Sequence, residues 1–196
     1  MPDTGAPWNI PYVAGTDLVS DWPTDSQTLA EAIADGLDDA SVAGIGPNVV
    51  QAVKTDTFST SSTSYTDVTG LTVTITPTSA TSKILLIADL TVSANNSSVG
   101  VQFAGGNSAN YTGDAAGSRG TGAEWSRTDG NFYVARTNLP NNLVYLDSPA
   151  TTSATTYSVQ IRVTSATGYV NQSLVDTDDT SHGRTASSLI AIEVAA

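Results

Sequence analysis

The chain contains no cysteine among its 196 residues. This absence excludes disulfide bonds, thiolate metal ligands and cysteine nucleophiles, and it leaves the redox compartment open. Only one histidine is present, His182, so a Ser-His-Asp relay would have to form around a single loop residue. We therefore expect no catalytic residue, no cofactor and no enzymatic activity.

Charged residues are also scarce, at 13% of the chain compared with about 25% in an average soluble domain. Basic residues are the rarest of them, because 7 Lys and Arg stand against 19 Asp and Glu, which gives a net charge of −12. An acidic protein is repelled by a phosphate backbone, so we expect no nucleic-acid partner. The acidity is concentrated in residues 1–53, which contain eight acids and no base.

Long apolar runs are absent as well, so the sequence predicts no membrane-spanning helix and no membrane insertion. Residues 1–5 have neither the basic start nor the apolar core of a signal peptide. The acids Asp176, Asp178 and Asp179 offer oxygen ligands, but they lack the glycine and the distal glutamate of a dedicated calcium loop. We expect solvated loop acids there and no metal site.

What the sequence does contain is apolar alternation, first in residues 67–93. Leu71, Val73 and Ile75 alternate with threonines, which predicts a strand with one buried face. A connection that begins with Pro77 leads to a second expected strand over residues 84–92. The first half of this strand is apolar on both faces, because Leu85 and Ile87 lie on the face opposite its main apolar row. Such a strand is expected to be central or pressed against another subunit. We expect these two neighbouring strands to pair and to form the core of the domain.

Similar short runs continue through residues 48–196. The other expected strands cover residues 49–53, 64–68, 99–103, 131–135, 143–146, 157–163, 169–173 and 188–194. About nine or ten short strands predict a mainly β fold, an antiparallel jelly-roll-like sandwich, with Ile190, Ile192 and Val194 closing the sheet. Residues 104–130 contain seven glycines and predict a long irregular excursion.

Aromatic residues in and beside this excursion allow two interpretations. Tyr111 and Trp125 lie near arginines, and aromatic faces beside polar side chains are typical of carbohydrate recognition. The alternative is that Trp125 plugs one end of the sandwich. The sequence leaves both open.

The amino-terminal third has a different character. Residues 1–23 contain four prolines and two tryptophans, which predict an extended segment that docks on another protein or packs on its own domain. Residues 24–40 predict a short amphipathic helix with Leu29, Ile33 and Leu37 on one stripe, able to pack on the β-domain or on symmetry copies. The glycine-rich residues 41–47 predict a hinge before the β-domain over residues 48–196.

The stretch from Trp8 to Asp21, followed by residues 27–34, resembles the amino-terminal docking segment of tailed-bacteriophage fibre and minor tail proteins. In that family an IPYP-x-x-TDLV stretch precedes a short helix, and here Val13 replaces the second proline. The strands over residues 49–60 and 84–87, the segment 145–149 and the strand 188–194 look like the β-rich head of such fibres, often a trimeric jelly roll.

The resemblance implies a virion structural protein on the particle exterior, a tail fibre or spike-like homotrimer that contacts other virion proteins and a host surface glycan. A head fibre or capsid decoration protein, and a carbohydrate-binding module, are the alternatives. The residues that match or adjoin the docking pattern are Trp8, Ile10, Tyr12, Asp17, Leu18 and Trp22.

Overall fold

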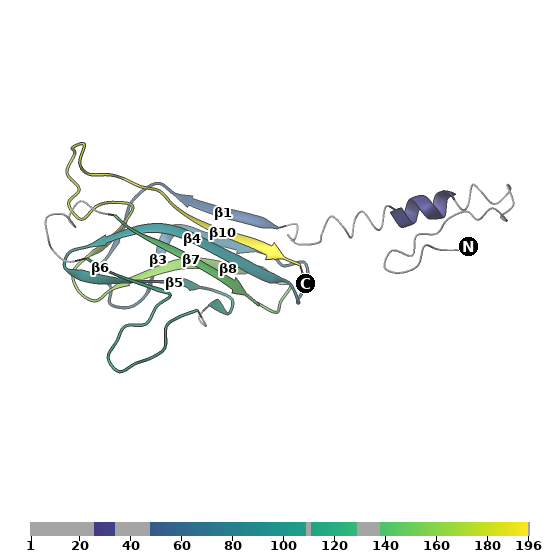
Figure 1. The fold of residues 1–196 in the computed structure, drawn as a ribbon, viewed down its shortest axis with the longest axis horizontal. Coiled ribbons are helices and arrows are strands. Elements are labelled where there is room, and N and C mark those ends of the chain that lie inside the picture. The colour runs from purple at the N-terminus through teal and green to yellow at the C-terminus, as the bar shows by residue number, and fades with distance from the viewer. Residues whose placement is uncertain (1–25, 34–47, 109–110, 129–137, 196) are drawn as a thin grey trace. The chain divides into compact units, whose positions relative to one another are not determined.

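The computed structural model describes residues 26–33, 48–108, 111–128 and 138–195. The chain divides into two compact units, Met1–Gly44 and Ile45–Ala196. Within the second unit the described residues form two antiparallel sheets packed as a sandwich (Figure 1). The predicted mainly β sandwich is therefore confirmed.

The strands divide unequally between the two sheets. The six-stranded sheet contains β1 (Val49–Lys54), β2 (Phe58–Thr60), β4 (Lys83–Ala94), β7 (Leu139–Asp147), β9 (Gly168–Val170) and β10 (Ser187–Val194). The four-stranded sheet contains β3 (Thr66–Ile75), β5 (Ser97–Ala104), β6 (Glu124–Thr128) and β8 (Thr155–Val163).

Strand β4 is central in the larger sheet, where it pairs with β10, β7 and β9, and β1 pairs with β10 at the edge. The smaller sheet has the order β3-β8-β5-β6. The chain crosses between the sheets after β2, β3, β4, β6, β7 and β8. The chain thus passes repeatedly from one antiparallel sheet to the other, and the two sheets form a β-sandwich.

Alternating side chains from both sheets fill the space between them. Leu86 and Leu90 of β4, with Val101 and Phe103 of β5, are at most 1% exposed. The burial of such aliphatic and aromatic side chains is the main driving force for folding. The apolar rows predicted for residues 71–75, 84–92, 99–103 and 157–163 all face this core.

The expected pairing of the first two strands is wrong. β3 pairs with β8 and β4 with β10 and β7, so the two neighbours in sequence belong to opposite sheets. Both contribute to the core, because alternation specifies which face is buried and not which strand is the hydrogen-bonded neighbour. The seven-residue connection between them is longer than a tight hairpin loop and bridges the two sheets, which stack about 10 Å apart.

Three other expectations about strands also need correction. Residues 124–128 form β6 inside the stretch expected to be irregular, and residues 58–60 form β2 inside an expected loop. The separate strand expected at 64–68 merges into β3, where Gly70 at φ +90° accompanies a shift in register between Asp67 and Thr72. The strand expected at 131–135 lies outside the described residues.

In the first unit, residues 26–33 are helical, as predicted for part of the segment 24–40. Leu29 is half-buried and Ile33 is 44% exposed. Leu37, the segment 1–23 that was predicted to be extended and the whole predicted hinge 41–47 lie outside the described residues. No helix in the described part of the chain is long and apolar enough to cross a membrane.

Candidate functional site

The outer surface of the six-stranded sheet carries aliphatic side chains from four adjacent strands. Strand register places Val49, Ile192, Leu85 and Leu146 in one row across β1, β10, β4 and β7. The next row brings together Ile190, Ile87 and Val144, with Gln51 at its edge. We call this surface the apolar face; its members are Val49, Val53, Leu85, Ile87, Val144, Leu146, Ile190, Ile192 and Val194.

The apolar face is exposed to solvent in the isolated chain. Val49, Val53 and Val144 are 55–57% exposed and Leu146 is 44% exposed. The members on the two middle strands are half-buried by their neighbours. Single exposed aliphatic residues are common on proteins, but a continuous aliphatic surface on one sheet face marks an interaction site.

The apolar face corrects one expectation about β10 and confirms one about β4. Ile190, Ile192 and Val194 were expected to close the sheet, yet they point outward, and the core side of β10 carries Leu189 and Ala191. The second apolar row of β4, with Leu85 and Ile87, does belong to a strand that is central in its sheet.

The core side of β10 also carries a carboxylate, Glu193, which is fully buried. Its Oε1 accepts hydrogen bonds from the backbone N–H and hydroxyl of Thr78 at 2.7 and 2.6 Å, and its Oε2 accepts one from Asn48 Nδ2 at 2.9 Å. Burial alone would raise the pKa of Glu193, but these hydrogen bonds outweigh burial and hold the pKa below its ordinary value. This network fixes the segment that leads into β1.

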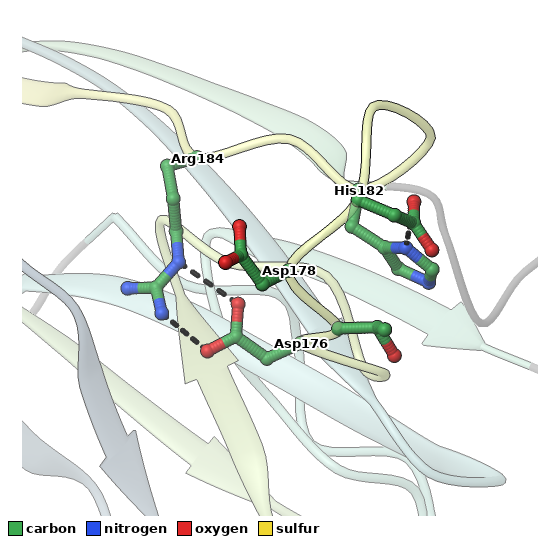
Figure 2. A pocket seen from close by; sticks show the side chains of 6 residues that line it. Asp176, Asp178, His182 and Arg184 are labelled. Atoms are coloured by element: carbon green, nitrogen blue, oxygen red, sulfur yellow. Dashed lines mark hydrogen bonds and ion pairs between the residues drawn. The ribbon is translucent and has the colours of Figure 1, made fainter.

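The loop between β9 and β10 forms a second polar cluster (Figure 2). Arg184 holds both carboxylate oxygens of Asp176, with Nε to Oδ1 at 2.9 Å. Asp179 accepts hydrogen bonds from the Ser181 hydroxyl and backbone and from His182 Nδ1, and these bonds lower the pKa of its carboxyl. Figure 2 shows Asp178 beside the Asp176–Arg184 pair.

This loop encloses a shallow pocket of about 240 Å³. Arg184 binds Asp176 and His182 binds Asp179, which favours a role of these four side chains in shaping the loop. Among the described residues no group of three His, Cys, Asp or Glu side chains is arranged to hold a metal ion.

The two residues predicted to contact a glycan lie in different environments. The ring of Tyr111 stacks on the buried Phe103 and on the half-buried Tyr145, with ring centroids 6.4 and 5.1 Å away. Trp125 instead lies on the outer face of the smaller sheet, opposite Gly100 of β5, and is 37% exposed. Neither aromatic ring contact of Tyr111 in the described part of the chain involves Trp125, so the two do not form one platform there.

Trp125 is held by close backbone contacts and by a cation. A Cβ at Gly100 or Gly120 would come within 2.6 and 2.0 Å of its ring, so both positions need glycine. The Arg162 guanidinium lies 5.8 Å from the Trp125 ring centroid and 5.7 Å from that of Tyr65. The Tyr65 hydroxyl donates a hydrogen bond to the Thr121 carbonyl at 2.5 Å. The contacts of Trp125, Arg162 and Tyr65 therefore anchor residues 120–122 on the sheet.

We expect Trp125→Ala to lower the free energy of unfolding by about 2 kcal/mol, because it removes a half-buried ring from a packed site. Urea unfolding followed by circular dichroism measures this loss. Ser118→Ala, at an exposed position of the same loop, is the control and should change stability little. Equal stability of the two variants would contradict the packing role of Trp125.

The proposed docking residues Trp8, Ile10, Tyr12, Asp17, Leu18 and Trp22 lie outside the described residues. The sequence did not identify the apolar face as a whole, although Leu85 and Ile87 gave a signal for it.

No protein-family model matches this chain, and a search of the curated proteins finds no match either.

Proposed function

We propose that this chain is a structural protein of a bacteriophage virion, a tail fibre or spike-like component. It docks on other virion proteins through residues 1–23 and projects its β-domain outward as a homotrimer for attachment to the host surface. The observation that carries the proposal is the division of the chain, because the docking-like pattern lies in Met1–Gly44 and the sandwich lies in Ile45–Ala196.

The chemistry of the two units suits these separate roles. Residues 1–23 offer tryptophan, tyrosine and isoleucine side chains between prolines, and large aromatic side chains dominate the energetics of protein interfaces. The strands β3 and β8 of the sandwich present threonine, serine and glutamine on their outer face. A capsid head fibre or decoration protein would have the same organisation and is the alternative.

We expect deletion of residues 1–23 to reduce incorporation into virions to background, while the circular dichroism of the β-domain stays unchanged. Purified particles from a complementation assay, probed by immunoblot, measure the incorporated protein. The matched control replaces residues 1–23 by a Gly/Ser segment of equal length, which should also fail to be incorporated. Normal incorporation of either variant would overturn the docking role.

A carbohydrate-binding module remains the second candidate function. The observation in its favour is the 37% exposed ring of Trp125 beside Arg162, since an aromatic face next to a cation suits an acidic sugar. A glycan array would distinguish the two candidates, because a glycan reader binds a sugar class and loses that binding in Trp125→Ala.

A further inference from the structure

We propose that the apolar face is the contact between copies of this chain. This inference deepens the homotrimer of the proposed function and rests on it, because it names the surface through which the copies meet. The apolar face of each copy is thus turned toward a common threefold axis, where it contacts the rim of the same face on a neighbouring copy.

The apolar face is large enough to form the centre of a contact of this kind. Four strands about 4.8 Å apart, over six residues rising about 3.4 Å each, give a flat area on the order of 400 Å². The side chains that protrude from it and a polar rim, which includes Gln51, Ser188 and Asn142, enlarge this area. A specific interface needs about 800 Å² per partner, and such interfaces have an apolar centre within a polar rim.

The charge of the face also suits a second copy. Asp89 and Lys83 lie on β4 at opposite ends of the outer rows, and the rows between them contain no charged residue. The face is therefore neutral, whereas the whole chain carries a net charge of −12. Two copies that meet through this neutral face therefore repel each other less than they would through an acidic surface.

The shape and chemistry of the face argue for the same occupant. In the described part of the chain its two central rows contain aliphatic side chains and Gln51 only, so they offer a partner few hydrogen bonds. Around a threefold axis two identical faces cannot lie flat on each other, so the apolar face of each copy meets the edge of the same face on the next copy, and the three faces surround an apolar centre. Copies of this chain supply that contact without any further component.

The test compares two glutamate substitutions in the full-length protein. Val144→Glu puts a charge in a central row of the apolar face, at a side chain that is 55% exposed, so the protein can fold with it. Thr72→Glu puts the same charge on the exposed outer face of β3 in the other sheet. Light scattering after size exclusion measures the mass of each protein, and circular dichroism verifies the fold.

We expect the mass of three chains for the wild type and for Thr72→Glu, and the mass of one chain for folded Val144→Glu. Association of the wild type should tighten as salt rises from about 0.05 to about 0.5 M, because salt screens repulsion between acidic copies. If the face instead bound a basic partner protein, a rise in salt would weaken the association.

Two results would overturn the inference. The first is an oligomeric Val144→Glu, which would place the contact elsewhere and leave the homotrimer standing. The second is a monomeric wild type, with the face covered by another segment of the chain or by a different protein, which removes the homotrimer too. Neither result touches virion docking, which the deletion of residues 1–23 tests separately.

Discussion

Replacement of Gly105 by alanine is expected to lower the free energy of unfolding of the β-domain by about 3 to 4 kcal/mol. Gly105 has φ +99°, a conformation that residues with a Cβ rarely adopt. A Cβ there would also lie 1.9 Å from the carbonyl oxygen of Thr156 on β8. Because the obstacle is backbone, it cannot move aside without shifting a strand.

Gly117→Ala is the matched control for this prediction. Gly117 also has a positive φ, +64°, but a Cβ there would meet nothing within 4 Å. Its substitution should therefore cost only the backbone strain of about 1 kcal/mol. Urea unfolding of both variants measures the difference, and losses of similar size would show that the contact with Thr156 does not matter.

The cost at Gly105 extends to a buried polar network. The turn it forms brings the Asn107 backbone N–H to both carboxylate oxygens of Asp147 at 3.2 Å. Asp147 is fully buried and also accepts a 2.6 Å hydrogen bond from the Tyr157 hydroxyl. Burial, together with this bond to a carboxylate, raises the pKa of Tyr157. A displaced turn leaves the buried carboxylate with fewer donors, which is costly.

The sequence predicted which side chains face the core wherever one face of a strand is apolar and the other is polar. In β3 and β8 the alternation of valine and isoleucine with threonine, serine or glutamine matches the buried and exposed faces. Strand pairing was not predictable in the same way, because it depends on register with distant segments. β6 was missed since Trp125 is its only large apolar side chain and lies on the outer face.

The apolar face was predictable only in part, for a related reason. Leu85 and Ile87 stood out because their strand is apolar on both sides. In β10, however, the residues Ile190 and Ile192 looked like core residues, and nothing local shows that the carboxylate of Glu193 is on the buried side. Its donors, Thr78 and Asn48, are more than 100 residues away in sequence.

Glu193→Gln is expected to lower the free energy of unfolding by about 2 kcal/mol at neutral pH. Both carboxylate oxygens accept hydrogen bonds, two from Thr78 and one from Asn48. A glutamine can place its oxygen at one of these positions only, so its NH₂ group must face a donor at the other. Since Glu193 is fully buried, water does not replace the lost bond.

The pH dependence of stability gives this prediction a second measurement. The folded pKa of Glu193 lies below its ordinary value of 4.5, so the ionised group stabilises the folded state above that value. This contribution is lost as the pH falls from 4.5 through the folded pKa. In Glu193→Gln that part of the acid destabilisation should disappear, because no proton binds there.

The control for both measurements is Glu124→Gln on β6, which removes the same charge outside the Glu193 network. It should keep the wild-type loss of stability in acid and change stability little at neutral pH. Chemical unfolding at several pH values between about 3 and 7 compares the three proteins. An acid profile of Glu193→Gln that parallels the wild type would show that Glu193 does not drive the loss. The contribution of the buried Glu193 side chain to stability would then not depend on its ionisation.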